Sequence, residues 1–424
     1  YFIWQADPTG ALLFKHLILA AERGVRIRLL VDDLVLAVRD REITAMTQHP
    51  YIDIRIFNPG RYRDSTLAFV GNFLLDFRQM NRRMHNKLMV IDNRAAIVGG
   101  RNIGDPYFGL GQPYNFVDLD LLALGPVVTE TSSAFDLYWN DEMAYPGDAM
   151  AENATPDDFA KRRQHNVAFL ETQADRLTAF RESPDEQRTR LETLPERVAA
   201  GEAHFLQDTP LETDDRTLRL ADMLNLLAAP SHEELIIATP YLIPVGNFLD
   251  DLTRLTEEGV RVRIITGSLG SNNHTAAHSH YRKYRQKILD TGAELYEFRH
   301  DPDEKIRHYT DTPPERAKFI SLHTKTLVGD RQNCFIGSLN LDPRALVINT
   351  ENGLYIESVT LCGELADRLD GLFSGKNSWQ VSASENGSLQ WRAGNDQISR
   401  QPARNAWQRF ADFFYGLLPI EDQL

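Results

Sequence analysis

The 424-residue chain contains only two cysteines, Cys334 and Cys362, and it has no long hydrophobic run. Two cysteines cannot build a disulfide framework or a metal-ligand cluster, and although one bridge between them is open, we expect buried free thiols. No stretch approaches the ~20 apolar residues of a membrane-spanning helix. The chain starts at Tyr1 in a segment typical of the middle of a strand. We therefore expect that an N-terminal targeting segment is missing from it.

The chain also has fewer basic than acidic residues. The chain has 46 Lys and Arg against 60 Asp and Glu, a formal net charge of -14. This balance argues against a non-specific nucleic-acid binder, which needs a basic surface, but it leaves room for a local basic pocket. The length suggests two domains or one large duplicated domain.

A short polar pattern occurs twice. The first copy has His85, Lys87 and, five residues after the lysine, Asp92; the second has His323, Lys325 and Asp330 at the same spacing. A single His-x-Lys is usually an accident, whereas two copies in matched surroundings are not. Two facing histidines can share a double displacement at phosphorus, one as nucleophile and one as acid and base.

The repeat extends beyond the motif. Each half has a helix, a glycine (Gly24 or Gly259), a strand, a second short strand (52–57 or 294–298), and its motif about 60 residues after the glycine. The alternation predicts two pseudo-symmetric α/β sandwich halves rich in parallel strands, with the active site at their interface. We place the first half at residues 1–215, including a partly helical connector from about 140, and the second at 216–424 with a C-terminal helix. Repeat arithmetic puts the division near Asp215 to Pro230.

Each motif leads into a predicted hairpin. Strands 88–91 and 95–98 flank Asp92, and strands 326–328 and 334–336 flank Asp330. On a strand the histidine and lysine share a face, whereas the two aspartates lie at turns and serve as supports. The hairpin exits add the polar candidates Asn102, Ser338 and Asn340. These amides and the lysines can stabilise charge on phosphoryl oxygens without a metal or another cofactor.

Two carboxylates follow the motifs, Asp118 in the first half and Glu351 in the second. Each can orient a histidine by accepting its Nδ1 proton. Because one histidine must be neutral while the other is protonated, we expect a bell-shaped pH profile for the pair.

These residues resemble the signature of the phospholipase D superfamily, His-x-Lys-x4-Asp followed by a glycine-rich exit with Ser and Asn, over nearly the whole chain. Gly100 departs from the pattern where the second copy has Ser338. Within the superfamily the sequence is most similar to bacterial cardiolipin synthases of the C type. This likeness is carried by Tyr1 to Gly10, the run from Ser268 to Arg285, and the ending Leu418 to Glu421.

The resemblance implies a phosphatidyltransferase that forms cardiolipin through a phosphohistidine, with His85 as nucleophile and His323 as acid and base. The implied acceptor is phosphatidylglycerol, and the implied donor is another phospholipid, with phosphatidylethanolamine as the candidate. It also implies peripheral association with a bacterial inner membrane and no nucleic-acid partner; the sequence names no protein partner.

Two segments bear on lipid access. The segment 278–285 interleaves cations and tyrosines, which makes His278, Tyr281 and Arg285 candidates for binding an anionic headgroup, although a solvated helix face fits equally well. Near the C-terminus, apolar side chains recur at helical spacing; they are Trp407, Phe410, Phe414 and Leu417, widened by Phe413 and Leu418. Packing into the core is the expectation for this pattern, and a membrane-surface helix is the alternative.

Three rival functions remain. A hydrolytic phospholipase D would use the same residues with water as acceptor. A phosphodiesterase on nucleic acid is disfavoured by the acidic charge and by the lack of an aromatic-basic groove pattern. A non-catalytic lipid-binding module would not need two intact His-Lys pairs.

Overall fold

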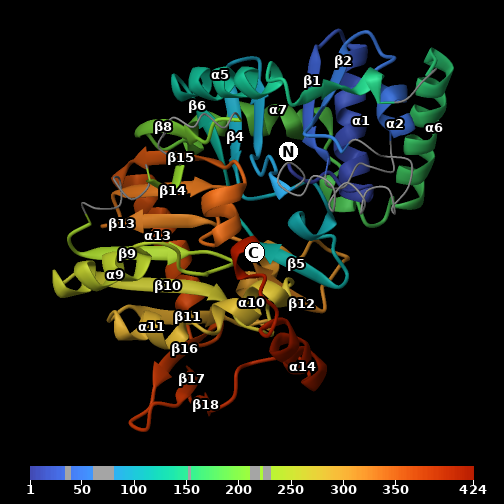
Figure 1. The fold of residues 1–424 in the computed structure, drawn as a ribbon. Coiled ribbons are helices and arrows are strands. Elements are labelled where there is room, and N and C mark those ends of the chain that lie inside the picture. Colours follow the sequence, from blue (N-terminus) through green and yellow to red (C-terminus); the bar gives the residue numbers. More distant parts are fainter. Residues whose placement is uncertain (34–39, 61–80, 151–153, 211–219, 223–230) are drawn as a thin grey trace.

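The computed structural model describes residues 1–33, 40–60, 81–150, 154–210, 220–222 and 231–424. The described chain is a mixed α/β protein with two halves, one containing β1 and β4 and the other β10 and β14 (Figure 1). The expected fold class is confirmed.

The first half has two three-stranded sheets. One has the order β1-β2-β7 and the other β3-β4-β6. Helices α1, α2, α5, α6 and α7 accompany them (Figure 1). The bounds are α1 (Pro8–Glu22), β1 (Ile27–Asp32), α2 (Asp40–Met46), β2 (Ile52–Phe57), β3 (Leu88–Ile91), β4 (Ala95–Gly99), β6 (Asp120–Leu124), α5 (Val127–Trp139), β7 (Ala144–Pro146), α6 (Pro156–Thr172) and α7 (Pro184–Glu192).

The second half is built on a ten-stranded sheet of order β18-β17-β16-β11-β10-β9-β13-β14-β15-β8. Its strands are β8 (Glu202–Gln207), β9 (Glu234–Ala238), β10 (Arg261–Gly267), β11 (Glu294–Phe298), β13 (Thr326–Gly329), β14 (Asn333–Gly337), β15 (Asn352–Glu357), β16 (Ser378–Ala383), β17 (Leu389–Ala393) and β18 (Asp396–Ile398). Its helices are α9 (Phe248–Glu257), α10 (Thr275–Tyr281), α11 (Arg285–Asp290), α12 (Glu304–Thr310), α13 (Val359–Phe373) and α14 (Ala406–Tyr415).

The repeat expected from the sequence is visible in the backbone. Helix α1 and helix α9 each end before a glycine in the left-handed region, Gly24 at φ 90° and Gly259 at φ 91°. A parallel pair follows in each half, β1 with β2 and β10 with β11. Both motif hairpins, β3-β4 and β13-β14, are antiparallel. Beyond these two units, β9 pairs with β10 in parallel and one further parallel pair joins the two halves, whereas the remaining pairs between strands of the described chain are antiparallel.

The two halves share one hydrophobic core. Val98 and Ala123 of the first half belong to the same buried cluster as Ile236 and Ile336 of the second. A two-stranded parallel sheet also joins them, formed by β5 (Tyr114–Val117) and β12 (Phe319–Leu322). The halves are thus packed together beside the segments that carry the motif histidines.

The connector is only partly helical, as expected. It contains α6 and α7, and it ends in strand β8, which pairs with β15 of the second half. A division at residue 215 would place β8 with the first half, whereas its strand partners belong to the second. The expected division itself, Asp215 to Pro230, lies mostly outside the described residues.

Two expectations from the sequence are corrected by the structure. Cys334 on β14 and Cys362 on α13 form a disulfide with Cα atoms 5.6 Å apart, so the expectation of free thiols is wrong. The C-terminal apolar residues do form a helix, α14, but Trp407 and Phe410 on it are 72% and 57% exposed. Core packing of this face is therefore also wrong.

Candidate active site

Each histidine lies shortly before the first strand of its motif hairpin. His323 follows β12 and precedes β13, and its backbone N–H donates to the Val117 carbonyl at 2.8 Å. His85 lies before β3, and its N–H donates to the Thr350 carbonyl at 2.9 Å. Both backbone partners belong to the opposite half. We expected the motif residues to lie inside strands. They lie instead in short extended segments that are held by the other half.

The orienting carboxylates cross over between the halves. Nδ1 of His85 lies 2.8 Å from both carboxylate oxygens of Glu351. Nδ1 of His323 lies 2.5 Å from Oδ2 of Asp118. A carboxylate on Nδ1 holds the imidazole in one tautomer and leaves Nε2 for chemistry. The structure thus brings His85 to Glu351 and His323 to Asp118, each pair joining residues that the sequence places far apart.

The two half-sites differ at Gly100 and Ser338. The hydroxyl of Ser338 donates to the Glu351 carboxylate and accepts from the Asn352 N–H at 3.0 Å. At Gly100 a Cβ would lie 2.3 Å from Oδ1 of Asp118, too close for any side chain. The missing hydroxyl in the first copy therefore has a physical reason, because the Asp118 carboxylate occupies its space.

The two lysines are buried beside the histidines. Lys87 and Lys325 are 1% and 2% exposed, and each Nζ donates to the carbonyl of its own motif histidine at 2.6 Å. Burial lowers the pKa of Lys87 to about 7, although Glu351 acts to raise it. Burial likewise lowers the pKa of Lys325 to about 8, opposed by Asp118. Lys325 lowers the pKa of His85 and Lys87 lowers the pKa of His323, so the charge of each half-site acts on the histidine of the other.

Both imidazoles favour the neutral form. Burial lowers the pKa of His85 well below its usual range, and Lys87 and Lys325 lower it further. Burial also lowers the pKa of His323, followed by the charges of the two lysines and of His85. A neutral imidazole is the nucleophilic form. An anionic phosphodiester placed beside it would favour the protonated form of the second histidine, which is the form that can donate to a leaving alcohol.

The other predicted polar residues divide into two groups. Asn340 is buried, and its Oδ1, a hydrogen-bond acceptor, has no partner in the described part of the chain. The amide of Asn102 is used internally, donating to the Tyr107 hydroxyl at 2.9 Å and accepting from the Ile3 N–H at 3.3 Å.

The motif aspartates lie at the hairpin turns, at φ 51° for Asp92 and 49° for Asp330. Asp92 is exposed at its turn. The Asp330 carboxylate accepts three backbone N–H groups, from His232, Glu233 and Glu234, at 2.8 to 2.9 Å. The contacts of Asp330 fit a structural support, whereas the part of the chain that the structure describes shows no hydrogen bond to the Asp92 carboxylate.

The three headgroup candidates lie in a buried network instead. Tyr281 and Arg285 both donate to Glu297, the latter at 2.6 Å. His278 contacts Asp412 at 2.7 Å through Nδ1 and Arg285 at 3.0 Å through Nε2. All three candidates are 3% exposed or less. With their polar atoms bonded inside the protein, their positions do not fit contact with a lipid headgroup.

Sequence reasoning missed the aromatic walls and one cation. Phe2 packs edge-on to His85 with ring centroids 4.8 Å apart, and Tyr107 and Phe116 pack against His323 at 5.2 and 4.6 Å. Arg344 also lowers the pKa of His85 and so lies near it. Phe116 is two residues before Asp118, and Arg344 is four residues after Asn340. Their closeness in the sequence to predicted site residues is the feature that could have identified them.

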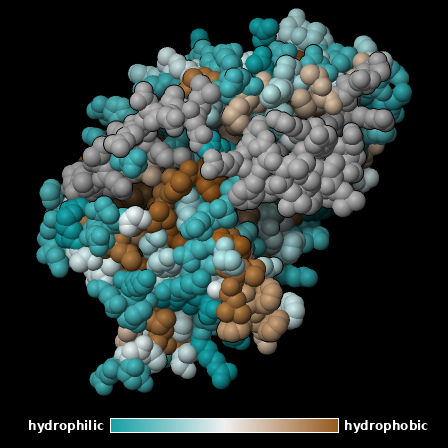
Figure 2. All heavy atoms as spheres, viewed as in Figure 1, coloured by the Kyte–Doolittle hydropathy of each residue, from teal (hydrophilic) through white to brown (hydrophobic). Residues whose placement is uncertain are grey.

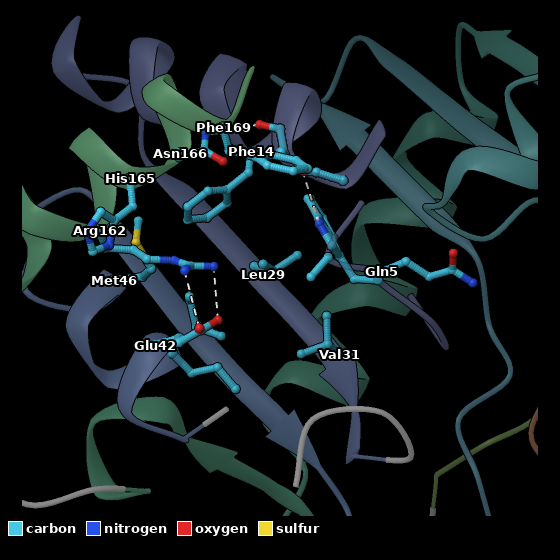
Figure 3. Close-up of a pocket in the computed structure, with 16 residues that line it drawn as sticks. Gln5, Phe14, Leu29, Val31, Glu42, Met46, Arg162, His165, Asn166 and Phe169 are labelled. Atoms are coloured by element: carbon cyan, nitrogen blue, oxygen red, sulfur yellow. Dashed lines mark hydrogen bonds and ion pairs between the residues drawn. The ribbon is translucent and has the colours of Figure 1, made fainter. Parts of the chain in front are cut away.

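A separate cavity of about 390 Å³ lies in the first half, and neither His85 nor His323 is among the residues that line it (Figure 3). Its lining is largely apolar, with Phe14, Leu29 and Met46 among the residues drawn, and the Arg162–Glu42 ion pair lies beside it at 2.9 Å. The segment from Phe2, which touches His85, to Trp4, which lines this cavity, connects the two places.

Within the described ranges, no group of three or more His, Cys, Asp or Glu side chains is arranged to hold a metal ion. In that same part of the chain, no helix combines the length and the apolar character needed to cross a bilayer.

Two histidines in matched half-sites, each with a lysine and a crossed carboxylate, define a phosphodiester-processing enzyme of the phospholipase D class. The family described as "Cardiolipin synthase, PLD-like domain" matches residues 1–139 and 224–373. The chain belongs to this family of phospholipase D-type phosphatidyltransferases.

Relatives agree with this assignment, and one solved structure agrees with the fold. The chain is 34% identical over 438 residues to cardiolipin synthase C of Escherichia coli, covering 99% of this chain and 89% of that protein. It is 30% identical over 391 residues to an uncharacterised protein of Helicobacter pylori, covering 90% and 74%. The crystal structure of phosphatidylserine synthase from Haemophilus influenzae has the same fold, with a TM-score of 0.58 at 15% identity, covering 89% of this chain and 80% of that one.

Proposed function

We propose that this protein forms cardiolipin by moving a phosphatidyl group from one phospholipid to phosphatidylglycerol through a phosphohistidine. The observation that carries the proposal is the pair of crossed contacts, His85 with Glu351 and His323 with Asp118. The similarity to cardiolipin synthase C over almost the whole chain supports the choice of product.

The chemistry follows from the two imidazoles. Nε2 of His85 attacks phosphorus, the bond from phosphorus to the headgroup oxygen breaks, and His323 gives its proton to the leaving alcohol. A hydroxyl of phosphatidylglycerol then attacks the phosphohistidine while His323 takes the hydroxyl proton, and the P–N bond breaks. The released alcohol is glycerol from a phosphatidylglycerol donor or ethanolamine from a phosphatidylethanolamine donor. His85 and His323 return to their starting protonation states.

The remaining site residues stabilise the transferred group. Lys87, Lys325 and the amide of Asn340 surround the place where non-bridging oxygens gain charge in the transition state. Preorganised donors in a buried site are worth roughly 10²- to 10³-fold in rate each. The aromatic rings of Phe2 and Tyr107 exclude water beside the histidines, which favours a lipid alcohol over hydrolysis. We place this reaction at the inner membrane of a bacterium, with the protein attached peripherally.

The test is a product analysis with purified protein and labelled phosphatidylglycerol, with and without phosphatidylethanolamine. Labelled cardiolipin and released glycerol are expected with phosphatidylglycerol alone, and ethanolamine release identifies the second donor. Phosphatidic acid as the only labelled product would reject the transferase and favour a hydrolytic phospholipase D. The His85→Ala variant is the control, and it should yield neither product.

A further inference from the structure

Helix α14 has its polar side chains buried and its apolar side chains exposed. Gln408 and Asp412 point inward, at 7% and 0% exposure. The exposed apolar residues are more than half accessible; they are Trp407, Phe410, Phe413, Phe414 and, just after the helix, Leu417. Figure 2 shows the resulting hydrophobic patch over α14, at the lower right of the view.

Specific contacts fix the helix in this orientation. The Asp412 carboxylate binds Nδ1 of His278 at 2.7 Å, the amide of Gln401 at 2.9 Å, and pairs with Arg282 at 3.3 Å. Gln408 donates to the Leu269 carbonyl at 2.5 Å. Rotating the helix to bury its aromatic rings would leave a buried carboxylate and its cationic neighbours without partners, a cost of several kcal/mol. The aromatic face is therefore held outward by the fold itself.

The exposed charges in residues 399–418, the segment that carries this face, are of one sign; the next charged residues along the chain, Glu421 and Asp422, are acidic, and Glu421 is paired with Lys283. In residues 399–418 the exposed charged side chains are Arg400, Arg404 and Arg409, and the one carboxylate, Asp412, is buried. This local positive charge stands out on a chain of net charge -14. Aromatic rings mixed with arginines are typical of surfaces that enter the interface of an anionic bilayer. A two-fold dimer through the same face would set arginine against arginine.

The face is also connected to the candidate active site. Helix α10 packs on α14 and begins at His274, whose ring lies 5.8 Å from that of Tyr241. The seven residues of α10 span about 10 Å. After α14, the chain returns to the site, where the Arg344 N–H donates to the Leu424 carbonyl at 2.8 Å. Arg344 contributes to lowering the pKa of both His274 and His85, so its charge acts on both rings.

We propose that the α14 face, defined by Trp407, Phe410, Phe413, Phe414 and Leu417, docks this protein on an anionic phospholipid bilayer. This deepens the proposed function, because docking there would bring phospholipid to the histidine pair. Binding itself needs no turnover, so it can be tested separately from the reaction.

The first experiment measures co-sedimentation of the full chain with vesicles of phosphatidylcholine alone or mixed with phosphatidylglycerol. The wild type should bind the mixed vesicles more tightly, and added salt should weaken the binding. The double variant Trp407→Ser with Phe410→Ser should bind them at least tenfold more weakly. Leu191→Ser is the matched control, since Leu191 on α7 is 67% exposed and lies outside the α14 face. Equal binding by the double variant and the wild type would overturn the proposal.

Further measurements separate loss of bilayer docking from misfolding of the variant and from dimer formation through the same face. Brominated lipids should quench part of the wild-type tryptophan fluorescence, and Trp407→Phe should lose that part while still binding. The ratio of turnover on vesicles to turnover on short-chain monomeric phosphatidylglycerol should fall at least tenfold in the double variant. If light scattering shows instead that the double variant only converts a dimer to monomers, with vesicle binding intact, the α14 face is a protein interface and the proposal fails. Vesicle binding with no transfer by the wild type would reject the reaction and leave the docking surface standing.

Discussion

Nδ1 of His85 lies 2.8 Å from the carboxylate of Glu351, although the two residues belong to different halves of the chain. His323 and Asp118 repeat the relationship in the opposite direction. Neither half holds an oriented histidine by itself. The duplicated chain therefore forms a single composite site, and removal of one carboxylate should impair a histidine from the other half.

The crossed carboxylates give the first prediction. Glu351→Gln should lower kcat roughly 10²- to 10⁴-fold, because an amide can present its N–H to Nδ1 and stabilise the wrong tautomer of His85. Asp118→Asn should do the same through His323. Steady-state kinetics on phosphatidylglycerol measure both, with thermal unfolding to show that the fold survives. A well-folded Glu351→Gln enzyme with more than half of the wild-type kcat would contradict the assignment.

The asymmetry at Gly100 gives a second prediction. Gly100→Ala places a Cβ against Oδ1 of Asp118 and should displace this carboxylate from His323. We expect kcat to fall about 10- to 100-fold, the range typical when the support of a functional histidine is disturbed. The matched change Ser338→Ala removes a hydroxyl from Glu351 without adding a clash, so its loss should be smaller. A larger loss of kcat in Ser338→Ala than in Gly100→Ala would show that the Asp118 carboxylate can move aside without losing its contact with His323.

The lysines predict the pH profile of kcat/KM, which reports the free enzyme. Lys87 and Lys325, with pKa values lowered to about 7 and about 8, lose their charge as the pH rises and then bind an anionic diester less well. At the acid end, burial raises the pKa of Asp118 to about 6, so protonation there removes the acceptor of His323. The profile should therefore be bell-shaped, with its maximum between about 6 and 8.

Lys87→Arg tests this interpretation, because arginine stays charged throughout the range. The alkaline limb of this variant should move to higher pH even if its maximal rate is lower. An alkaline limb that stays in place in both Lys87→Arg and Lys325→Arg would assign the limb to another group.

The hydrogen-bond network around Glu297 predicts that substitution of this residue lowers the stability of the fold without removing a catalytic group. This buried carboxylate accepts hydrogen bonds from Arg285, Tyr281 and Trp391 at 2.6 to 2.9 Å. Glu297→Ala would leave the buried guanidinium of Arg285 without its charge partner and should cost about 3–5 kcal/mol in the free energy of unfolding. Chemical denaturation measures it. A loss below about 1 kcal/mol would show that Arg285 finds another partner or reaches solvent.

Much of this arrangement could be predicted from the sequence because it is encoded locally. Helix, glycine and strand follow one another in both halves, and the hairpins around Asp92 and Asp330 have the predicted strands. The crossing of Asp118 and Glu351 could not be predicted, since it depends on how the two halves pack through β5 and β12. The inverted face of α14 was also hidden, because helical periodicity gives the apolar side of a helix but not the direction in which it points. Gln408 and Asp412 decide that direction through partners that are distant in the sequence.

The most direct test of the central claim is to trap the covalent intermediate by rapid acid-free quenching and to locate the phosphorus by mass spectrometry. With phosphatidylglycerol as donor, the wild type should carry a phosphatidyl group on His85, and His323→Asn should still form it from a donor with a good leaving group but fail to pass it on. His85→Ala should carry none. A covalent group on His323 alone would reverse the two roles. Efficient transfer with no adduct on either histidine would contradict the two-histidine mechanism itself.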